Sequence, residues 1–182
     1  MSGKEDGILE NENGVRNGIT VFDEGDIVVY PNHGAGCVSG VEKKTVLGEE
    51  RSYYVIYIQD TGLTLSIPAD SESGLRYCAD EDGVVEAISV LGDVAVEMPA
   101  NWNHRLKFNQ KKLREGDIGQ VAEVIRDLNT YSKEHGLSTG ERNMLMKARQ
   151  ILASEIALVR ETKVKEAETL MDEALVGGGE EA

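Results

Sequence analysis

The chain has 182 residues, of which 40% are hydrophobic and 29% are charged, and its formal net charge is −14. This length can bury a core in one or two domains, and this composition is typical of a globular protein. No apolar run approaches the roughly 18 residues that a membrane-spanning helix needs, so the sequence excludes insertion into a membrane.

Residues 1–21 mix acidic residues, asparagine and glycine without a sustained period. This pattern predicts a flexible N-terminal extension. The same segment lacks the apolar core of a secretory signal, which predicts a cytoplasmic location.

From Phe22 onward, the chain contains short segments rich in β-branched and aromatic residues. They predict strands at 26–30, 35–42, 52–58 and 63–67. Turn residues separate them at 31–34, around Gly48 and at 60–62. Such strands predict a small, strongly bent antiparallel sheet or β-barrel, in a domain that spans residues 22–72.

Beyond a polar joint at 70–74, the apolar residues recur with a helical period. Helices are expected at 83–91, from Trp102 to about Leu113 with Asn101 as the cap, and from 117 to near Gly136. The sequence Ser138-Thr139-Gly140-Glu141 is a capping box that opens a long helix, and a last short helix includes 164–175. We therefore predict an α+β fold, with an all-α domain at 73–176 and a disordered tail at 177–182.

The net charge hides a strong asymmetry along the chain. Residues 1–101 hold 6 basic and 19 acidic residues, residues 102–150 hold 10 and 6, and residues 151–182 hold 3 and 8. Affinity for nucleic acid comes mainly from Lys and Arg, so a charge of −14 would ordinarily argue against it. The single basic stretch, however, begins at the single tryptophan, Trp102.

The sequence offers little for catalysis. His33, His104 and His135 have no carboxylate or thiol at a spacing that links them, and the glycines at 34, 36 and 40 form no phosphate loop. Cys37 and Cys78 belong to no Cys/His cluster, so neither a metal site nor a disulfide is indicated. We predict a protein that is not an enzyme and needs no cofactor.

Trp102 allows two interpretations. On a helix, Trp102, Leu106 and Leu113 fall within one sector, which is the pattern of a tryptophan buried at the start of a packed helix. Its nearest neighbours are nevertheless asparagine and histidine, and a helix start projects beyond a bundle. Cations follow at Arg105, Lys107, Lys111, Lys112, Arg142, Lys147 and Arg149. An aromatic side chain among cations is typical of proteins that wedge open a base step from the minor groove.

These segments resemble the CarD family of bacterial RNA polymerase-binding regulators, also called CarD/CdnL. The matching segments are GDIVVYPNHGAG at 25–36, the strand pair ending in Ile67-Pro68-Ala69, PANWNHRLK at 99–107, VAEVIRDL at 121–128 and GLSTGERNMLMKARQIL at 136–152. The last segment is most similar to actinobacterial members. The resemblance runs from Phe22 to about Leu175, with both domains in the family's order.

The resemblance implies a Tudor-like N-terminal domain that docks on a lobe of the polymerase β subunit, as in transcription-repair coupling factors. It also implies a helical domain whose tryptophan, here Trp102, enters the minor groove at the upstream edge of the transcription bubble. The family's other DNA contacts fall on Arg105, Lys107, Lys112 and Arg142. The polymerase-facing side of the β domain includes Lys44, Thr64, Leu65 and Ser66.

Three departures from the family bear on affinity. Some relatives have arginine where this chain has Ser66, which implies a missing salt bridge to the β lobe. His104 and Tyr131 also stand where some relatives have arginine, which implies weaker binding to free DNA. Residues 1–21 have no counterpart in the resemblance.

The sequence thus predicts a monomeric transcription regulator that binds the polymerase β subunit and stabilises the promoter open complex without reading a base sequence. Docking on polymerase raises the local concentration, so a weak basic face suffices. The alternative is a protein–protein adaptor of the transcription machinery, in which the helical domain binds another protein and Trp102 lies in the core. A small-molecule enzyme is the third and least favoured hypothesis.

Overall fold

The structure is a computed structural model that describes residues 15–16, 19–31, 33–69 and 74–177. Within the predicted N-terminal extension, it places two short strands that pair with each other, β1 (Val15–Arg16) and β2 (Ile19–Thr20). Residues 1–14 and 17–18 of this predicted extension, and all of the predicted tail except residue 177, lie outside the described residues.

The N-terminal domain is built on a five-stranded antiparallel sheet. Its strands are β3 (Ile27–Tyr30), β4 (Gly34–Val46), β5 (Glu49–Ile58), β6 (Leu63–Pro68) and β7 (Arg76–Tyr77), in the order β6-β5-β4-β3-β7. The α+β class is confirmed. The outer strands β6 and β7 do not pair with each other, so the sheet stays open and is a barrel only in a loose sense. Strand β7 lies beyond the boundary predicted at residue 72 and adds to the same sheet.

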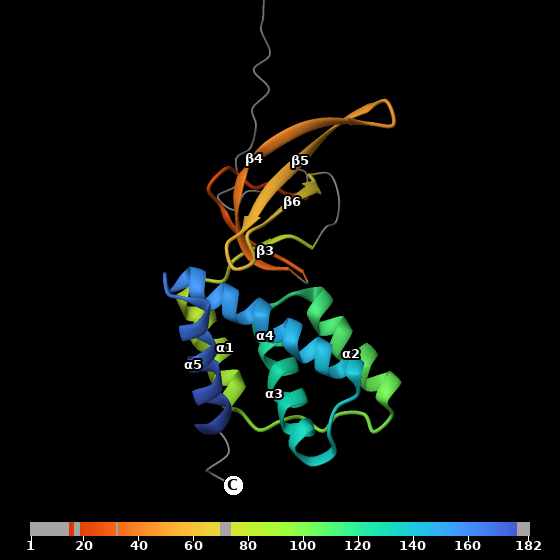
Figure 1. Cartoon of the computed structure of the whole chain (residues 1–182), viewed down its shortest axis with the longest axis vertical. Coiled ribbons are helices and arrows are strands. Elements are labelled where there is room, and N and C mark those ends of the chain that lie inside the picture. The colour runs from red at the N-terminus through yellow and green to blue at the C-terminus, as the bar shows by residue number, and fades with distance from the viewer. Residues whose placement is uncertain (1–14, 17–18, 32, 70–73, 178–182) are drawn as a thin grey trace, which may run out of the picture.

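Strands β4 and β5 form a long hairpin that projects from the body of the sheet (Figure 1). Its two-residue turn is Leu47-Gly48, with positive φ at both residues, 55° and 85°. Such a turn suits the twist of a hairpin, but the left-handed conformation is costly for leucine. A β-bulge between Val38 and Gly40 shifts the register of β4 against β5.

Five helices follow the sheet, and the caps that the sequence indicated are present. They are α1 (Glu81–Gly92), α2 (Trp102–Glu115), α3 (Ile118–His135), α4 (Thr139–Val159) and α5 (Val164–Gly177). Asn101 caps α2 by accepting from the backbone N–H groups of Asn103 and His104. The capping box of Ser138 and Glu141 opens α4. The helix positions are thus confirmed.

The two domains are in direct contact. Figure 1 shows the sheet lying over a layer of helices, with α4 running beneath the β3 and β4 end of the sheet. One apolar core lies within the sheet and contains Val28, Val38 and Ile56. The larger core lies between the helices, and it also contains Val29 and Ala35 from the sheet. Strand β3 therefore supplies side chains to both cores from its two faces.

Candidate functional site

Trp102 lies at the first position of α2, and its side chain is 54% exposed. A tryptophan carries roughly 250 Å² of mostly apolar surface, so this exposure forgoes roughly 3 kcal/mol of burial. Of the two interpretations of Trp102, the structure therefore supports the exposed residue at a helix start and not the buried core residue. Figure 1 shows the N-terminal ends of α2 and α4 on the same side of the helical layer, and Arg105 and Glu141 join them there.

Arg105, which the resemblance assigns to DNA, follows Trp102 in the first turn of α2 and is buried. Its Nη1 donates to the carbonyl oxygens of Pro99 and Ala100, at 2.9 and 3.2 Å, and its Nε donates to a carboxylate oxygen of Glu141. The guanidinium also lies over the ring of Tyr131, 4.0 Å from its centroid. With 4% of its surface exposed, Arg105 is placed to hold the segment before α2 rather than to reach a phosphate.

Glu141 is the acceptor on which this arrangement depends. It receives hydrogen bonds from the backbone N–H and the hydroxyl of Ser138 as well as from Arg105, and it is buried. Burial by itself raises the pKa of this carboxyl, but the hydrogen bonds from Arg105 and Ser138 outweigh it. The pKa of Glu141 therefore lies below its ordinary value, and the group is ionised at neutral pH.

The other three predicted DNA contacts divide into two groups. Lys107 and Arg142 are exposed, and neither forms an ion pair within the described part of the chain. Lys112 is different, because its Nζ lies 2.7 Å from a carboxylate oxygen of Glu123 and only 15% of its side chain is exposed. A contact with DNA requires an exposed side chain, but Lys112 is largely buried, because the C-terminal half of α2 packs against Glu123 and Asp127 of α3.

The predicted polymerase-facing residues lie on one side of the sheet, except Leu65. Lys44 Nζ donates to Ser66 Oγ at 2.9 Å and lies over the ring of Tyr53, 5.5 Å from its centroid. Thr64 and Ser66 alternate with Leu65, which packs into the core of the sheet. We call the exposed side the outer sheet face, and it consists of Lys44, Tyr53, Val55, Tyr57, Thr64 and Ser66.

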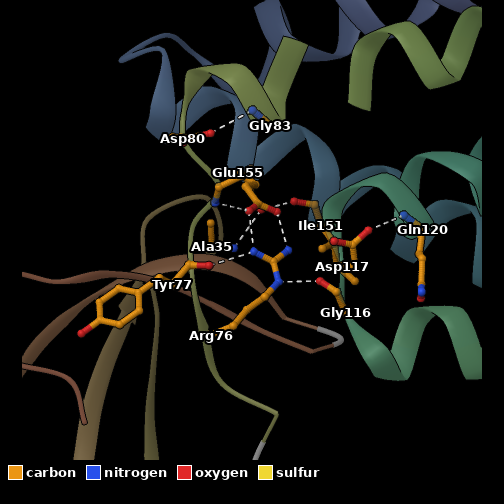
Figure 2. Close-up of polar contacts among 12 residues, drawn as sticks. Ala35, Arg76, Tyr77, Asp80, Gly83, Gly116, Asp117, Gln120, Ile151 and Glu155 are labelled. Atoms are coloured by element: carbon orange, nitrogen blue, oxygen red, sulfur yellow. Dashed lines mark hydrogen bonds and ion pairs between the residues drawn. The ribbon is translucent and has the colours of Figure 1, made fainter. Parts of the chain in front are cut away.

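The two domains are joined by a largely buried polar cluster (Figure 2). Both Nη atoms of Arg76 on β7 donate to the carboxylate of Glu155 on α4, at 2.6 and 2.8 Å. Glu155 also accepts from the backbone N–H of Ala79 at 2.9 Å, and Arg76 Nε donates to the carbonyl oxygen of Gly116 at 2.5 Å. We call this cluster the domain joint. Burial raises the pKa of the nearby Cys78 thiol to about 12, so it stays protonated at neutral pH.

Neither a metal site nor a membrane span is found in the described ranges. Within them, no three His, Cys, Asp or Glu side chains are grouped so that they could hold a metal ion. None of the helices described here is long and apolar enough to cross a membrane.

Comparison with known proteins identifies the family. The family model for the CarD C-terminal domain matches residues 86–172, and the model for the CarD-like/TRCF RID domain matches residues 22–77. The chain is also 33% identical over 142 residues to the putative transcription factor YdeB of Bacillus subtilis (strain 168), covering 77% of this chain and 93% of that protein. This chain belongs to the CarD family. Both CarD domains are present, in the order that the sequence indicated.

Within this CarD-family chain, the structure adds residues that sequence reasoning did not assign to the site. Glu141 was identified as a capping residue, but nothing in its spacing showed that it also pairs with Arg105, 36 positions earlier. Arg76 and Glu155, 79 positions apart, carried no motif at all. Both pairs connect elements that only the tertiary fold brings together.

Proposed function

We propose that this protein is a transcription regulator that docks on the β subunit of RNA polymerase through its outer sheet face. Trp102 then enters the minor groove of promoter DNA at the upstream edge of the bubble and slows collapse of the open complex. The observation that carries the proposal is a single tryptophan, 54% exposed, at the start of α2, with the exposed cations Lys107 on the same helix and Arg142 in the first turn of α4. The family and the relative described as a putative transcription factor support it.

The chemistry of the Trp102 end fits DNA without base-specific readout. The indole can stack on a base of any sequence, while Lys107 and Arg142 offer charges to the backbone phosphates. Two such cations give weak binding, and the net charge of −14 opposes it further. Tethering through polymerase is therefore an essential part of the proposal, because it supplies the local concentration that the charge does not.

The outer sheet face fits a protein partner. It presents the aromatic rings of Tyr53 and Tyr57, and tyrosine is enriched at protein interfaces. Lys44 lies on the same face, where its Nζ is 3.3 Å from a carboxylate oxygen of Glu42. Strand β6 is the outermost strand, and no strand that the structure describes pairs with its second edge. A strand of the partner can therefore add to the sheet beside Thr64 and Ser66.

The main test is the lifetime of the open complex on a promoter, with wild-type protein and with Trp102→Ala. Base–aromatic stacking is worth about 1–3 kcal/mol, so Trp102→Ala is expected to shorten the added lifetime by about 5- to 150-fold. The control is Val85→Ala, which truncates another half-exposed apolar residue, on α1. Both variants are expected to be captured by polymerase as well as the wild type. Equal open-complex lifetimes with Trp102→Ala and wild-type protein would contradict the proposed role of Trp102.

A second test addresses the cations. Lys107→Glu is expected to lower open-complex stabilisation about tenfold without changing thermal stability, because its side chain is exposed and unpaired in the described structure. Lys165→Glu on α5 makes the same charge change on an exposed helix face and is expected to have little effect. If the two variants behave alike, the cations near Trp102 are an ordinary solvated surface.

The adaptor alternative is weakened in one respect. It placed Trp102 in the core, whereas the residue is half-exposed. The adaptor alternative predicts that forked promoter DNA leaves the fluorescence of Trp102 unchanged. Quenching by forked DNA in the presence of polymerase favours the wedge.

A further inference from the structure

We propose that the domain joint makes the two domains a single rigid body, so that Arg76 and Glu155 are positioning residues for Trp102. This inference rests on the proposed function for its biological meaning. The rigidity itself can be measured without polymerase or DNA.

The first argument is that the joint connects the sheet to the helix that carries Trp102. Arg76 belongs to β7, and it holds Glu155 on α4 and the carbonyl oxygen of Gly116, which is the C-cap of α2 (Figure 2). Trp102 is the first residue of that same helix. One guanidinium therefore couples the N-terminal domain directly to the far end of the Trp102 helix.

The second argument is the strength of the contact. Glu155 is fully buried, and its carboxylate accepts two hydrogen bonds from Arg76 and one from the backbone of Ala79, all from the segment that leaves the sheet. A bidentate pair of arginine and carboxylate fixes orientation as well as distance. Removing Arg76 would leave the buried carboxylate of Glu155 without a cation, so a swinging motion that opens the pair is costly.

The third argument is that the sheet touches α4 at a second place. The backbone N–H of Ala35 donates to Ser154 Oγ at 2.9 Å, and this hydroxyl donates to the carbonyl oxygen of Ile151. Gly34 has a φ of 89°, and a Cβ on it would lie 2.5 Å from Ser154 Oγ. The start of β4 thus lies directly on α4, and only glycine allows this approach. Two separate polar contacts and the shared apolar core oppose rotation about different axes.

The geometry shows why rigidity matters. Helix α2 has 14 residues, which gives a rod about 21 Å long at 1.5 Å per residue. A tilt of about 10° at its Gly116 end would move the Trp102 end by about 3.6 Å, close to the rise of one base step of about 3.4 Å. A loose joint would place the indole against the wrong step, whereas a fixed joint lets docking on polymerase define its position.

The test is a variant that removes the charges of the joint while filling its volume, Arg76→Met with Glu155→Met. Replacing both members avoids the unpaired charge that a single substitution would leave. The matched control, Arg149→Met with Asp172→Met, removes an ion pair that also involves α4 but joins it to α5 within the helical domain. If the joint variant fails to fold, Arg76→Lys takes its place, because lysine keeps the charge but cannot bridge Glu155 and Gly116 together.

The first readout is the distribution of distances between spin labels on the two domains of the full chain. The labels are attached at Ser39→Cys and Ser132→Cys, both exposed, in a Cys37→Ser background. Cys78 is retained, because its raised pKa of about 12 keeps its thiol unreactive at neutral pH. We expect a single narrow distribution for the wild type and the control pair, and a clearly broader one for the joint variant. A joint variant as narrow as the wild type overturns the inference.

The second readout links the joint to Trp102. The joint variant is expected to be captured by polymerase and to bind forked DNA within about twofold of wild type, because each domain keeps its own surface. Its effect on open-complex lifetime is expected to fall at least about fivefold, as for a misplaced stack worth roughly 1 kcal/mol. A broadened distribution with a full lifetime effect would show that Arg76 and Glu155 do not position Trp102. If the wild type has no lifetime effect, the proposed function fails, and the distances still decide on rigidity.

Discussion

Replacing Arg105 by methionine distinguishes two roles for this residue. In one, Arg105 is a buried clamp that pairs with Glu141, and in the other it contacts DNA. Methionine fills much of the same volume but leaves the carboxylate of Glu141, which is 1% exposed, without its cationic partner. Removing one member of a buried pair costs about 3–5 kcal/mol. Ser138 still donates two hydrogen bonds to Glu141, so we expect a loss near the lower end, about 3 kcal/mol. For a chain of this size, such a loss lowers Tm by about 6–12 °C.

The assay is urea unfolding followed by circular dichroism, with the fluorescence anisotropy of Trp102 as a local probe. The control is Arg105→Met combined with Glu141→Gln, because glutamine keeps the acceptor of the capping box and removes the unpaired charge. We expect this double variant to regain most of the lost stability. If Arg105→Met alone stays within about 0.5 kcal/mol of wild type and only DNA binding falls, Arg105 is a surface contact and the clamp is refuted.

Two further predictions concern stability. Leu47→Asn is expected to raise the free energy of unfolding by about 1 kcal/mol, because asparagine tolerates the left-handed conformation and the fully exposed leucine loses no burial. Calorimetry checks this, and Leu47→Ala, which keeps a strained Cβ, is the control that should show no such gain. The folded-state pKa of Glu141 is lowered, so its stabilising effect is complete above its ordinary pKa of 4.5 and is lost as pH falls through the folded-state value. Urea midpoints from about pH 7 to about pH 3 should therefore fall less steeply for Glu141→Gln than for wild type.

Local patterns in the sequence predicted the helices well, because their caps depend on neighbouring residues. Asn101 and Ser138 bond backbone groups two or three positions away, so their roles can be read from spacing. Strand β7 was missed because a two-residue strand has no period, and it exists only through pairing with β3. The sequence likewise did not show that the sheet stays open, because this depends on which strands pair in the folded chain.

The candidate site was predicted less completely, for a physical reason. The sequence identified which cations lie near Trp102, but their exposure depends on acids brought in from other helices. Arg105 pairs with Glu141 and Lys112 pairs with Glu123, so both basic side chains are largely buried. Lys107 and Arg142 have no acidic partner in the described structure. For Leu65, the alternation along a strand could have shown that it faces away from Thr64 and Ser66.

The outermost position of β6 also affects how copies of this protein behave toward one another. An exposed strand edge is a template for any other strand, including the same strand of a second copy. Each copy carries a net charge of −14, so two copies repel as they approach, and this repulsion weakens as salt or acid is added. The same net charge that we expect to weaken binding to free DNA therefore also opposes edge-to-edge association of two copies in dilute neutral solution.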